Sequence, residues 1–221
     1  MKPRFSQKRN SGMTLFEVGV VIAVVMILLV VLLPALRPAK RKVSRTNCVM
    51  NLKQIGLAYR IWADDHGDKY PMGISVTNGG SMEMVATGNV AQTFLVMSNE
   101  LSTPKILHCQ QDVAHIETNS FAGLTSSNIS YFVGVDVIND LNPLMLLSGD
   151  GNFEIGSVPV KSGLQQFWTN DPVAWTTNRH GSILGNIGLA DGSVHSATVV
   201  NFHYDHDLQR TGLATNRFAI P

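Results

Sequence analysis

The sequence predicts an α+β protein: a long N-terminal helix, with a transmembrane half and an amphipathic half, packed on a small antiparallel β-sheet domain with long loops. An uncharged apolar run lies near the N-terminus and continues into a helical pattern. The rest of the chain alternates short apolar runs with turn residues. A chain of 221 residues has room for one domain of ordinary size plus such an appendage.

The overall charge is balanced, with 17 Lys and Arg against 16 Asp and Glu and a net charge of +1. A dedicated nucleic-acid binder would usually carry a basic face, so nucleic acid is not expected as a partner. No G-x-S-x-G, H-E-x-x-H or Walker pattern occurs in the chain. We therefore expect no catalytic residues and no enzyme activity.

Residues 1–12 are basic and end in Gly12, and residues 13–36 are predicted to form a transmembrane helix. No charged residue or proline occurs from Val18 to Leu33, and with its flanks the run reaches the roughly 20 residues that span a bilayer. It is longer than the apolar part of a cleaved secretory signal, and no small-residue cleavage site follows it, so we expect an anchor that stays attached. Basic residues lie on both sides, so charge alone does not set the orientation.

Glu17 places a carboxylate near one end of this apolar run. A charged group in a membrane span is costly and is read as functional, with a partner to be found. The alternative is a local one, because Thr14-x-x-Glu17 has the pattern of a capping box at a helix N-terminus. The two interpretations are compatible.

Residues 37–65 are predicted to continue the helix as its amphipathic half. Apolar residues recur at steps of four and three and form one face, which we expect to pack on the globular domain: Cys48, Leu52, Ile55, Tyr59 and Trp62. Pro34 and Pro38 are expected to kink the helix. Gly67 is the candidate C-terminal cap.

Residues 66–221 are predicted to form a β-rich globular domain of short strands and turns. Strands are expected at 129–135 and 144–147, and a hairpin at 186–200 turns at Asp191-Gly192, a strong turn signal between apolar runs. Asp150 and Asp191 each stand beside a glycine and are expected in turns.

The segment Gly12-Met13-Thr14-Leu15-Phe16-Glu17 resembles the signal of prepilins, in which a basic leader ends in Gly before a hydrophobic residue, Thr-Leu and Glu. The resemblance implies that a prepilin peptidase cuts between Gly12 and Met13 and that the new N-terminus at Met13 is methylated. It also implies that Glu17 acts in assembly, by pairing with the Met13 amine of a neighbouring subunit. Phe16 stands where Ile is more common.

Further segments resemble the major-pseudopilin-like proteins of planctomycetes and verrucomicrobia: 48–58, 62–71, 97–105, 107–109, 130–134 and 186–194. Two departures are visible. Gln110 follows Cys109 where the family often has proline. Many relatives carry a His nine residues before an Asp-Gly pair, whereas ten residues separate His180 from Asp191 here.

This resemblance implies a structural subunit, a pseudopilin, of a type II secretion-like or type IV pilus-like filament. The implied partners are the prepilin peptidase and methyltransferase, other pilin-like subunits, an inner-membrane assembly platform and the lipid bilayer. The leader would be cytoplasmic and residues 66–221 periplasmic or extracellular, on a single-pass inner-membrane protein. The alternative is a membrane-anchored binding domain or enzyme that uses the leader for export and never polymerises.

Cys48 and Cys109 are the only cysteines. We expect them to form a disulfide, because the pair can oxidise in an extracytoplasmic domain; two buried free thiols are the alternative. No cofactor and no metal are expected. Calcium at the oxygen-rich group of Asp136, Asn139 and Asp140 stays open. His203 and His206 with Asp205 could form a small metal site, but we expect them to be solvated.

Overall fold

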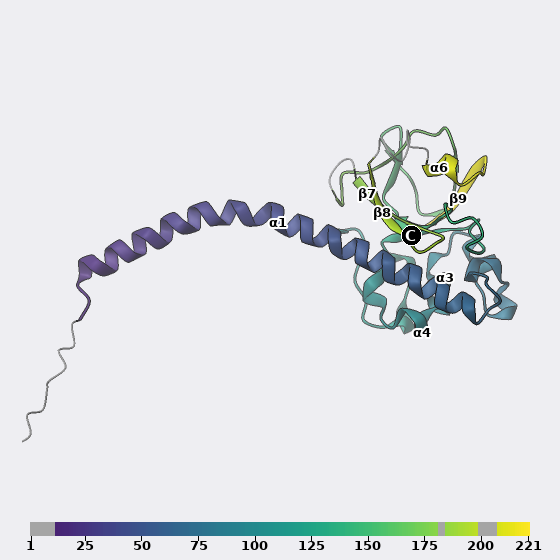
Figure 1. The fold of residues 1–221 in the computed structure, drawn as a ribbon, viewed down its shortest axis with the longest axis horizontal. Helices are drawn as coiled ribbons and strands as arrows, with labels where there is room; N and C mark the ends of the chain where they lie inside the picture. Colours follow the sequence, from purple (N-terminus) through teal and green to yellow (C-terminus); the bar gives the residue numbers. More distant parts are fainter. Residues whose placement is uncertain (1–11, 181–183, 199–206) are drawn as a thin grey trace, which may run out of the picture. The chain divides into compact units, whose positions relative to one another are not determined.

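A computed structural model describes residues 12–180, 184–198 and 207–221, with the backbone alone for residues 33–43. The chain divides into two compact units, Met1–Lys42 and Val43–Pro221. Helix α1 (Leu15–Asp64) belongs to both units, because it begins in the first and ends in the second (Figure 1).

The first unit contains the apolar part of α1. Within the described residues, one stretch is long and apolar enough to cross a membrane, Leu15–Leu32, with a mean hydropathy of 3.1. Its side chains are exposed in the isolated chain, as expected for a segment whose solvent would be lipid. The backbone is helical through Pro34 and Pro38. The side chains of residues 33–43 lie outside the described part. A kink is a bend of the helix axis, which the helical hydrogen bonding alone does not reveal, so the kink at these prolines stays a prediction.

The second unit contains the amphipathic part of α1 and its C-terminal cap. Gly67 has a φ of 65°, and the backbone N–H of Asp68 donates to the Ala63 carbonyl at 3.0 Å. This six-to-one hydrogen bond around a left-handed residue ends a helix by satisfying one of its last carbonyls. Gly67 therefore occupies the cap position that the sequence indicated.

The segment 71–128 differs from the expected strands and turns, because it forms short helices. These are η1 (Pro71–Gly73), η2 (Val76–Asn78), α2 (Met82–Val85), α3 (Val90–Val96), α4 (Ser98–Leu101), η3 (Pro104–Leu107), η4 (Phe121–Gly123) and η5 (Ser126–Asn128). Local caps support several of them; at α3, for example, the Asn89 side chain accepts hydrogen bonds from the backbone N–H groups of Ala91 and Gln92. Proline occupies the start of both η1 and η3.

Two antiparallel sheets follow within the described residues, a six-stranded one in the order β5-β9-β1-β2-β7-β8 and a three-stranded one in the order β4-β3-β6. The strands are β1 (Tyr131–Gly134), β2 (Leu146–Asp150), β3 (Phe153–Ile155), β4 (Val158–Pro159), β5 (Gly163–Trp168), β6 (Val173–Trp175), β7 (Leu184–Leu189), β8 (Val194–Thr198) and β9 (Thr215–Ile220), with α6 (Asp207–Arg210) before the last.

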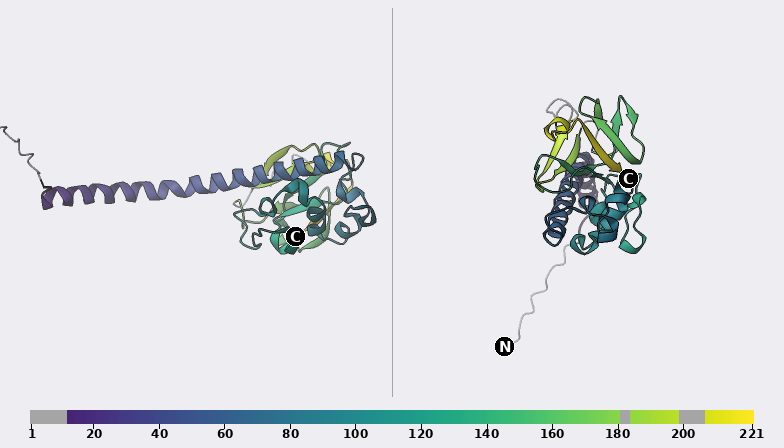
Figure 2. Two further views of the ribbon diagram at one scale, coloured as in Figure 1. Left: turned by 90° about the horizontal axis from the view of Figure 1, so that it is seen from below. Right: turned by 90° about the vertical axis from the view of Figure 1, so that its right-hand side faces the viewer.

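The six-stranded sheet has a hydrophobic core on each face. Tyr131 and Val133 of β1 point to the helices, and Phe132 between them points to the three-stranded sheet, because successive side chains of a strand alternate between faces. The core on the helix side contains the α1 stripe of Leu52, Ile55, Tyr59 and Trp62. In Figure 2 (right) most strands lie on one side of the unit together with the yellow helix α6, and α1 and the teal short helices lie on the other. The predicted α+β class is confirmed.

The hairpin predicted around Asp191-Gly192 is present. Strands β7 and β8 pair antiparallel, from Leu184 with Thr198 to Gly188 with Val194, and Gly192 has the positive φ of 82° that the turn needs. Residues 199–200, the predicted end of this hairpin, lie outside the described part. Asp191 lies in the turn as expected, but Asp150 does not.

The prediction that Asp150 lies in a turn is wrong. It is the last residue of β2 and lies directly opposite Tyr131 of β1. β2 lies between β1 and β7 in the middle of the sheet, so the Asp150 side chain is completely buried. The neighbouring glycine had suggested a turn, but the sheet position decides the environment of this carboxylate.

Candidate functional site

The first candidate site is the N-terminus of α1. The Glu17 Oε2 atom accepts hydrogen bonds from the Thr14 backbone N–H at 2.7 Å and from the Thr14 hydroxyl at 3.0 Å. The Thr14 Oγ1 atom in turn accepts from the Glu17 backbone N–H at 3.3 Å. This reciprocal pair is a capping box. Gly12 and Met13 precede the helix and are exposed.

The second candidate site surrounds a disulfide. Cys48 of α1 is bonded to Cys109, which follows η3, with 5.6 Å between their Cα atoms. Both residues are completely buried. The Cys109 backbone N–H donates to the Ser130 hydroxyl at 2.9 Å, which fixes the loop against the start of β1. The pair that the sequence analysis favoured is thus bonded in the structure, and a disulfide suggests an extracytoplasmic domain.

His180 and Asp150 lie against this disulfide. The His180 Nε2 atom is 3.6 Å from the Cys109 sulfur and 3.3 Å from the Asp150 Oδ2 atom. The same oxygen accepts hydrogen bonds from the backbone N–H and the side-chain amide of Asn186, at 2.7 and 2.9 Å. The side chains of His180 and Asp150 are 1% and 0% exposed. Two sulfurs, an imidazole and a carboxylate therefore meet in the interior.

A second group of polar side chains consists of Asp112, His115 and Arg179, the residue before His180. The Asp112 Oδ2 atom is 2.5 Å from the Arg179 Nη2 atom and 2.7 Å from the His115 Nδ1 atom. The other terminal nitrogen of Arg179 donates to the Ser130 carbonyl. Arg179 and Asp112 are 4% and 3% exposed, so this is a buried ion pair, and its hydrogen bonds satisfy both charges.

The electrostatics of these groups follow from burial and pairing. Burial by itself would raise the pKa of Asp112, but the hydrogen bond from His115 and the positive charge of Arg179 outweigh it and hold that pKa well below its usual range. Burial raises the pKa of Tyr131 far above its usual value, and the Asp150 carboxylate raises it further. Asp112 is thus an anion and Tyr131 a neutral phenol at physiological pH.

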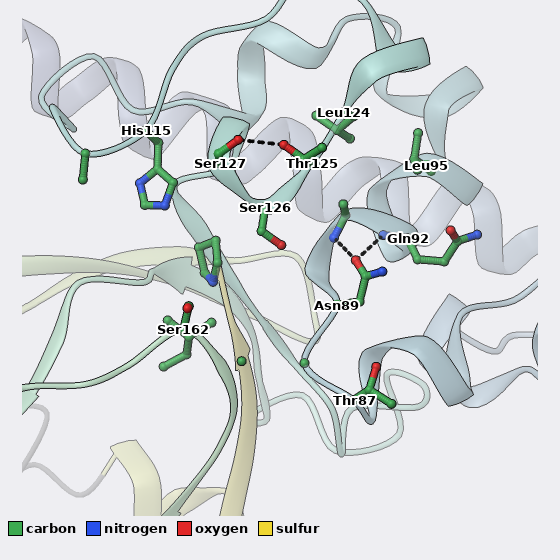
Figure 3. Close-up of a pocket in the computed structure, with 16 residues that line it drawn as sticks. Thr87, Asn89, Gln92, Leu95, His115, Leu124, Thr125, Ser126, Ser127 and Ser162 are labelled. Carbon is green, nitrogen blue, oxygen red and sulfur yellow. Dashed lines mark hydrogen bonds between the residues drawn. The ribbon is translucent and has the colours of Figure 1, made fainter.

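His115 also borders an open pocket of about 730 Å³. Hydroxyl and amide side chains dominate its polar lining: Thr87, Asn89, Gln92, Thr125, Ser126, Ser127 and Ser162. In Figure 3 the Asn89 side chain is turned toward the backbone at the start of α3, and the Thr125 and Ser127 hydroxyls bond each other at 2.7 Å. Several polar groups are thus satisfied within the protein itself.

The oxygen-rich group considered for calcium has other partners. Asp136 pairs with Arg217: its Oδ1 atom accepts from Arg217 Nε at 2.9 Å and from Arg217 Nη2, and its Oδ2 atom accepts from the Arg217 backbone N–H at 2.9 Å. The Asn139 side chain accepts from the Leu141 backbone N–H at 3.2 Å. These contacts do not favour calcium binding at this group. His203, Asp205 and His206 lie outside the described residues.

Sequence reasoning missed the convergence around the disulfide. It named His180 only through its spacing to Asp191 and placed Asp150 in a turn, and it did not select Asp112 or Arg179. A usable signal was present in the adjacent Arg179-His180 pair. An arginine next to a histidine in a largely polar loop calls for an acidic partner, although the sequence does not say which one.

The fold and these sites define a chain with an N-terminal apolar helix followed by a disulfide-bonded antiparallel β-sheet domain, an architecture consistent with pilin-like proteins. The apolar helix suggests membrane insertion or export. No protein-family model, curated protein or solved structure matches the chain.

Proposed function

We propose that this protein is a structural subunit, a pseudopilin, of a type II secretion-like or type IV pilus-like filament. The observation that carries the proposal is the Thr14–Glu17 capping box, which holds a carboxylate at the start of an exposed apolar helix. A basic leader that ends in Gly12 precedes this box in the sequence. Neither a secretory signal nor an ordinary membrane anchor needs that combination.

The chemistry of assembly follows from the position of Glu17. Cleavage between Gly12 and Met13 would create an ammonium group one helical turn before the carboxylate. In a bundle of such helices, the ammonium of one subunit can pair with Glu17 of the next. Opposite charges attract strongly in an apolar medium, so this pair would set the axial register between neighbouring helices.

The amphipathic part of α1 supports packing between copies. Its inner face is buried in the core, but three large apolar residues on the same helix remain exposed: Met50, Leu57 and Ile61. Leu57 follows Met50 by seven positions and Ile61 follows Leu57 by four, so the three side chains lie on one side of the helix. The occupant that we propose for this stripe is the stem helix of a second copy, as expected where stems bundle in a filament.

The remaining elements of the proposal concern location and partners. The chain would be inserted in the inner membrane by residues 13–36, with the leader cytoplasmic and residues 66–221 periplasmic or extracellular. The prepilin peptidase and methyltransferase would process Met13, and an inner-membrane platform would add the subunit to the fibre. The Cys48–Cys109 disulfide supports an oxidising compartment for the folded unit.

Substitution of Glu17 tests the proposal. Glu17→Ala should leave the subunit inserted, folded and cleaved, because a neutral residue suits the bilayer better, but incorporation into fibres should fail. Glu17→Asp, one methylene shorter, should be intermediate. Asp64→Ala is the matched control, because it removes an exposed carboxylate from the other end of the same helix. The measurements are leader removal by intact mass and the yield of sheared or imaged filaments.

Two outcomes would speak against this function. Fibres of Glu17→Ala as abundant as those of the wild type would rule out the charge-pair register. If the wild type never forms fibres, alone or with co-expressed partners, the chain is better described as an anchored extracytoplasmic binding domain. The pocket beside His115 would then be the first place to look for its ligand.

A further inference from the structure

The group around the disulfide contains the ligand types of a zinc site. The ligand atoms of Cys48, Cys109 and His180 all lie within 4.8 Å of one another, and the Asp150 carboxylate lies beside the same imidazole nitrogen. We propose that the chain binds one divalent cation of the zinc class when both cysteines are thiols. The two sulfurs, His180 Nε2 and the Asp150 carboxylate are the ligands.

The distances support a tetrahedral site. Zinc bonds of about 2.3 Å to sulfur and about 2.0 Å to nitrogen or oxygen give tetrahedral edges of about 3.5 Å for S···N and about 3.3 Å for N···O. The structure shows 3.6 Å from Cys109 Sγ to His180 Nε2 and 3.3 Å from His180 Nε2 to Asp150 Oδ2. Two edges of a tetrahedron are thus close to these lengths, and the two sulfurs have to move apart after reduction to complete the site.

The second observation is electrostatic. Asp150 is completely buried, and its Oδ1 atom has no hydrogen-bond partner among the described residues. A buried carboxylate needs a compensating charge, which a bound cation supplies. The two hydrogen bonds from Asn186 to Asp150 Oδ2 would orient this ligand, as outer groups do in metal sites.

Metal and disulfide are alternative states, because the sulfurs that form the S–S bond cannot both act as thiolate ligands. An oxidised small-molecule disulfide would convert one state into the other. The two cysteine thiolates lose two electrons and form the Cys48–Cys109 bond. The small-molecule disulfide takes up these electrons and becomes two thiolates, and the cation, having lost its sulfur ligands, is released. The metal would thus hold Cys48 and Cys109 together in the newly made chain until oxidation replaces it.

Cobalt binding to the full-length chain in detergent tests the proposal. After reduction with a phosphine, the wild type should take up one Co²⁺ per chain, with sulfur-to-cobalt charge-transfer absorption and the visible bands of tetrahedral cobalt. The oxidised chain should show neither. His180→Gln and Asp150→Asn should each weaken binding by about tenfold or more. His195→Gln is the matched control, because His195 also faces a carboxylate, Asp207 at 3.4 Å, in another part of the fold.

A second readout does not depend on colour. Zn²⁺ should slow oxidation of the reduced wild type by oxidised glutathione and should leave the rate unchanged in His180→Gln. Near-ultraviolet circular dichroism reports whether the reduced chain stays folded. If it does not, added Co²⁺ should restore the spectrum. A folded reduced chain without cobalt bands, an unfolded one that cobalt does not restore, or wild-type affinity in His180→Gln would each overturn the proposal.

Discussion

A Cβ atom built on Gly185 would lie 2.0 Å from the Cε2 atom of Trp175, so the Trp175 ring occupies the space that any side chain at position 185 would need. Trp175 is itself buried in the core between the two sheets. The close approach of β7 to this ring therefore depends on glycine.

Gly185→Ala should destabilise the protein by about 1–3 kcal/mol, because a buried ring or a central strand has to move. Gly188→Ala is the matched control on the same strand, since a Cβ there would meet its nearest atom at 3.4 Å, an ordinary contact. Denaturant unfolding of both variants measures the difference. Equal stability of the two variants would mean that the Trp175 ring shifts at no cost.

Removal of the disulfide should cost about 4 kcal/mol in the chain-entropy model for a loop of this size, since the sequence separation is 61 residues. The double variant Cys48→Ala and Cys109→Ala should show this loss in guanidinium unfolding. A chelator keeps any metal out of the comparison with the oxidised wild type. A loss well below 2 kcal/mol would indicate that the denatured chain already holds the α1 segment close to the loop of Cys109.

The buried Asp112–Arg179 pair predicts a pH dependence of stability. Because the pKa of Asp112 is lower in the folded state than in the unfolded chain, its contribution is fully present above the unfolded pKa of about 4. It is lost as the pH falls through the folded value. Asp112→Asn should be less stable than the wild type by about 3–5 kcal/mol at pH 7, because Arg179 is left without its partner.

The difference in the free energy of unfolding between Asp112→Asn and the wild type should become smaller below pH 4, where the stabilising contribution of the Asp112 carboxylate begins to be lost. Chemical unfolding at pH 7, 5 and 3 measures it. Asp136→Asn serves as the comparison, because its partner Arg217 is 45% exposed and such a pair contributes little. A constant gap across this pH range would show that Asp112 is not the titrating group.

Leu57 and Ile55 lie on the same helix, but the Leu57 side chain is exposed and the Ile55 side chain is buried in the core. Leu57→Glu changes a side chain that is 58% exposed, so the stability of the folded unit should change by less than about 0.5 kcal/mol. Filament yield should fall if the exposed stripe packs between copies. Ile55→Glu, at a completely buried position, should prevent folding. Wild-type filament yield in Leu57→Glu would remove the stripe from the proposed interface.

Processing should depend on the residue before the cut. Intact-mass analysis of the protein from its native membrane should find a chain that begins with N-methylated Met13. Gly12→Ala should slow cleavage moderately, and Gly12→Leu should block it, because a peptidase must approach the scissile backbone closely and glycine allows that approach. A native chain that still begins at Met1, in cells with an active prepilin peptidase, would contradict the leader assignment.

Local patterns predicted the elements whose structure depends on near neighbours. The stripe from Cys48 to Trp62 needs only the helical period, and it lies in the core. Asp191-Gly192 needs only its own turn preference and the flanking apolar runs, and it joins β7 to β8. The segment 71–128 was less predictable, because its helices are only three to seven residues long and several begin at a single cap such as Asn89.

By itself, the sequence determined the apolar helix, its amphipathic continuation and the presence of a single cysteine pair, since composition and period are properties of neighbouring residues. Only the tertiary structure decided that Asp150 and His180 lie against that pair. The four side chains come from four parts of the chain: Cys48 from α1, Cys109 from the loop after η3, Asp150 from β2 and His180 from the loop after β6. Their meeting depends on the order of strands in the sheet, which places β2 between β1 and β7 and buries its last carboxylate beside the disulfide.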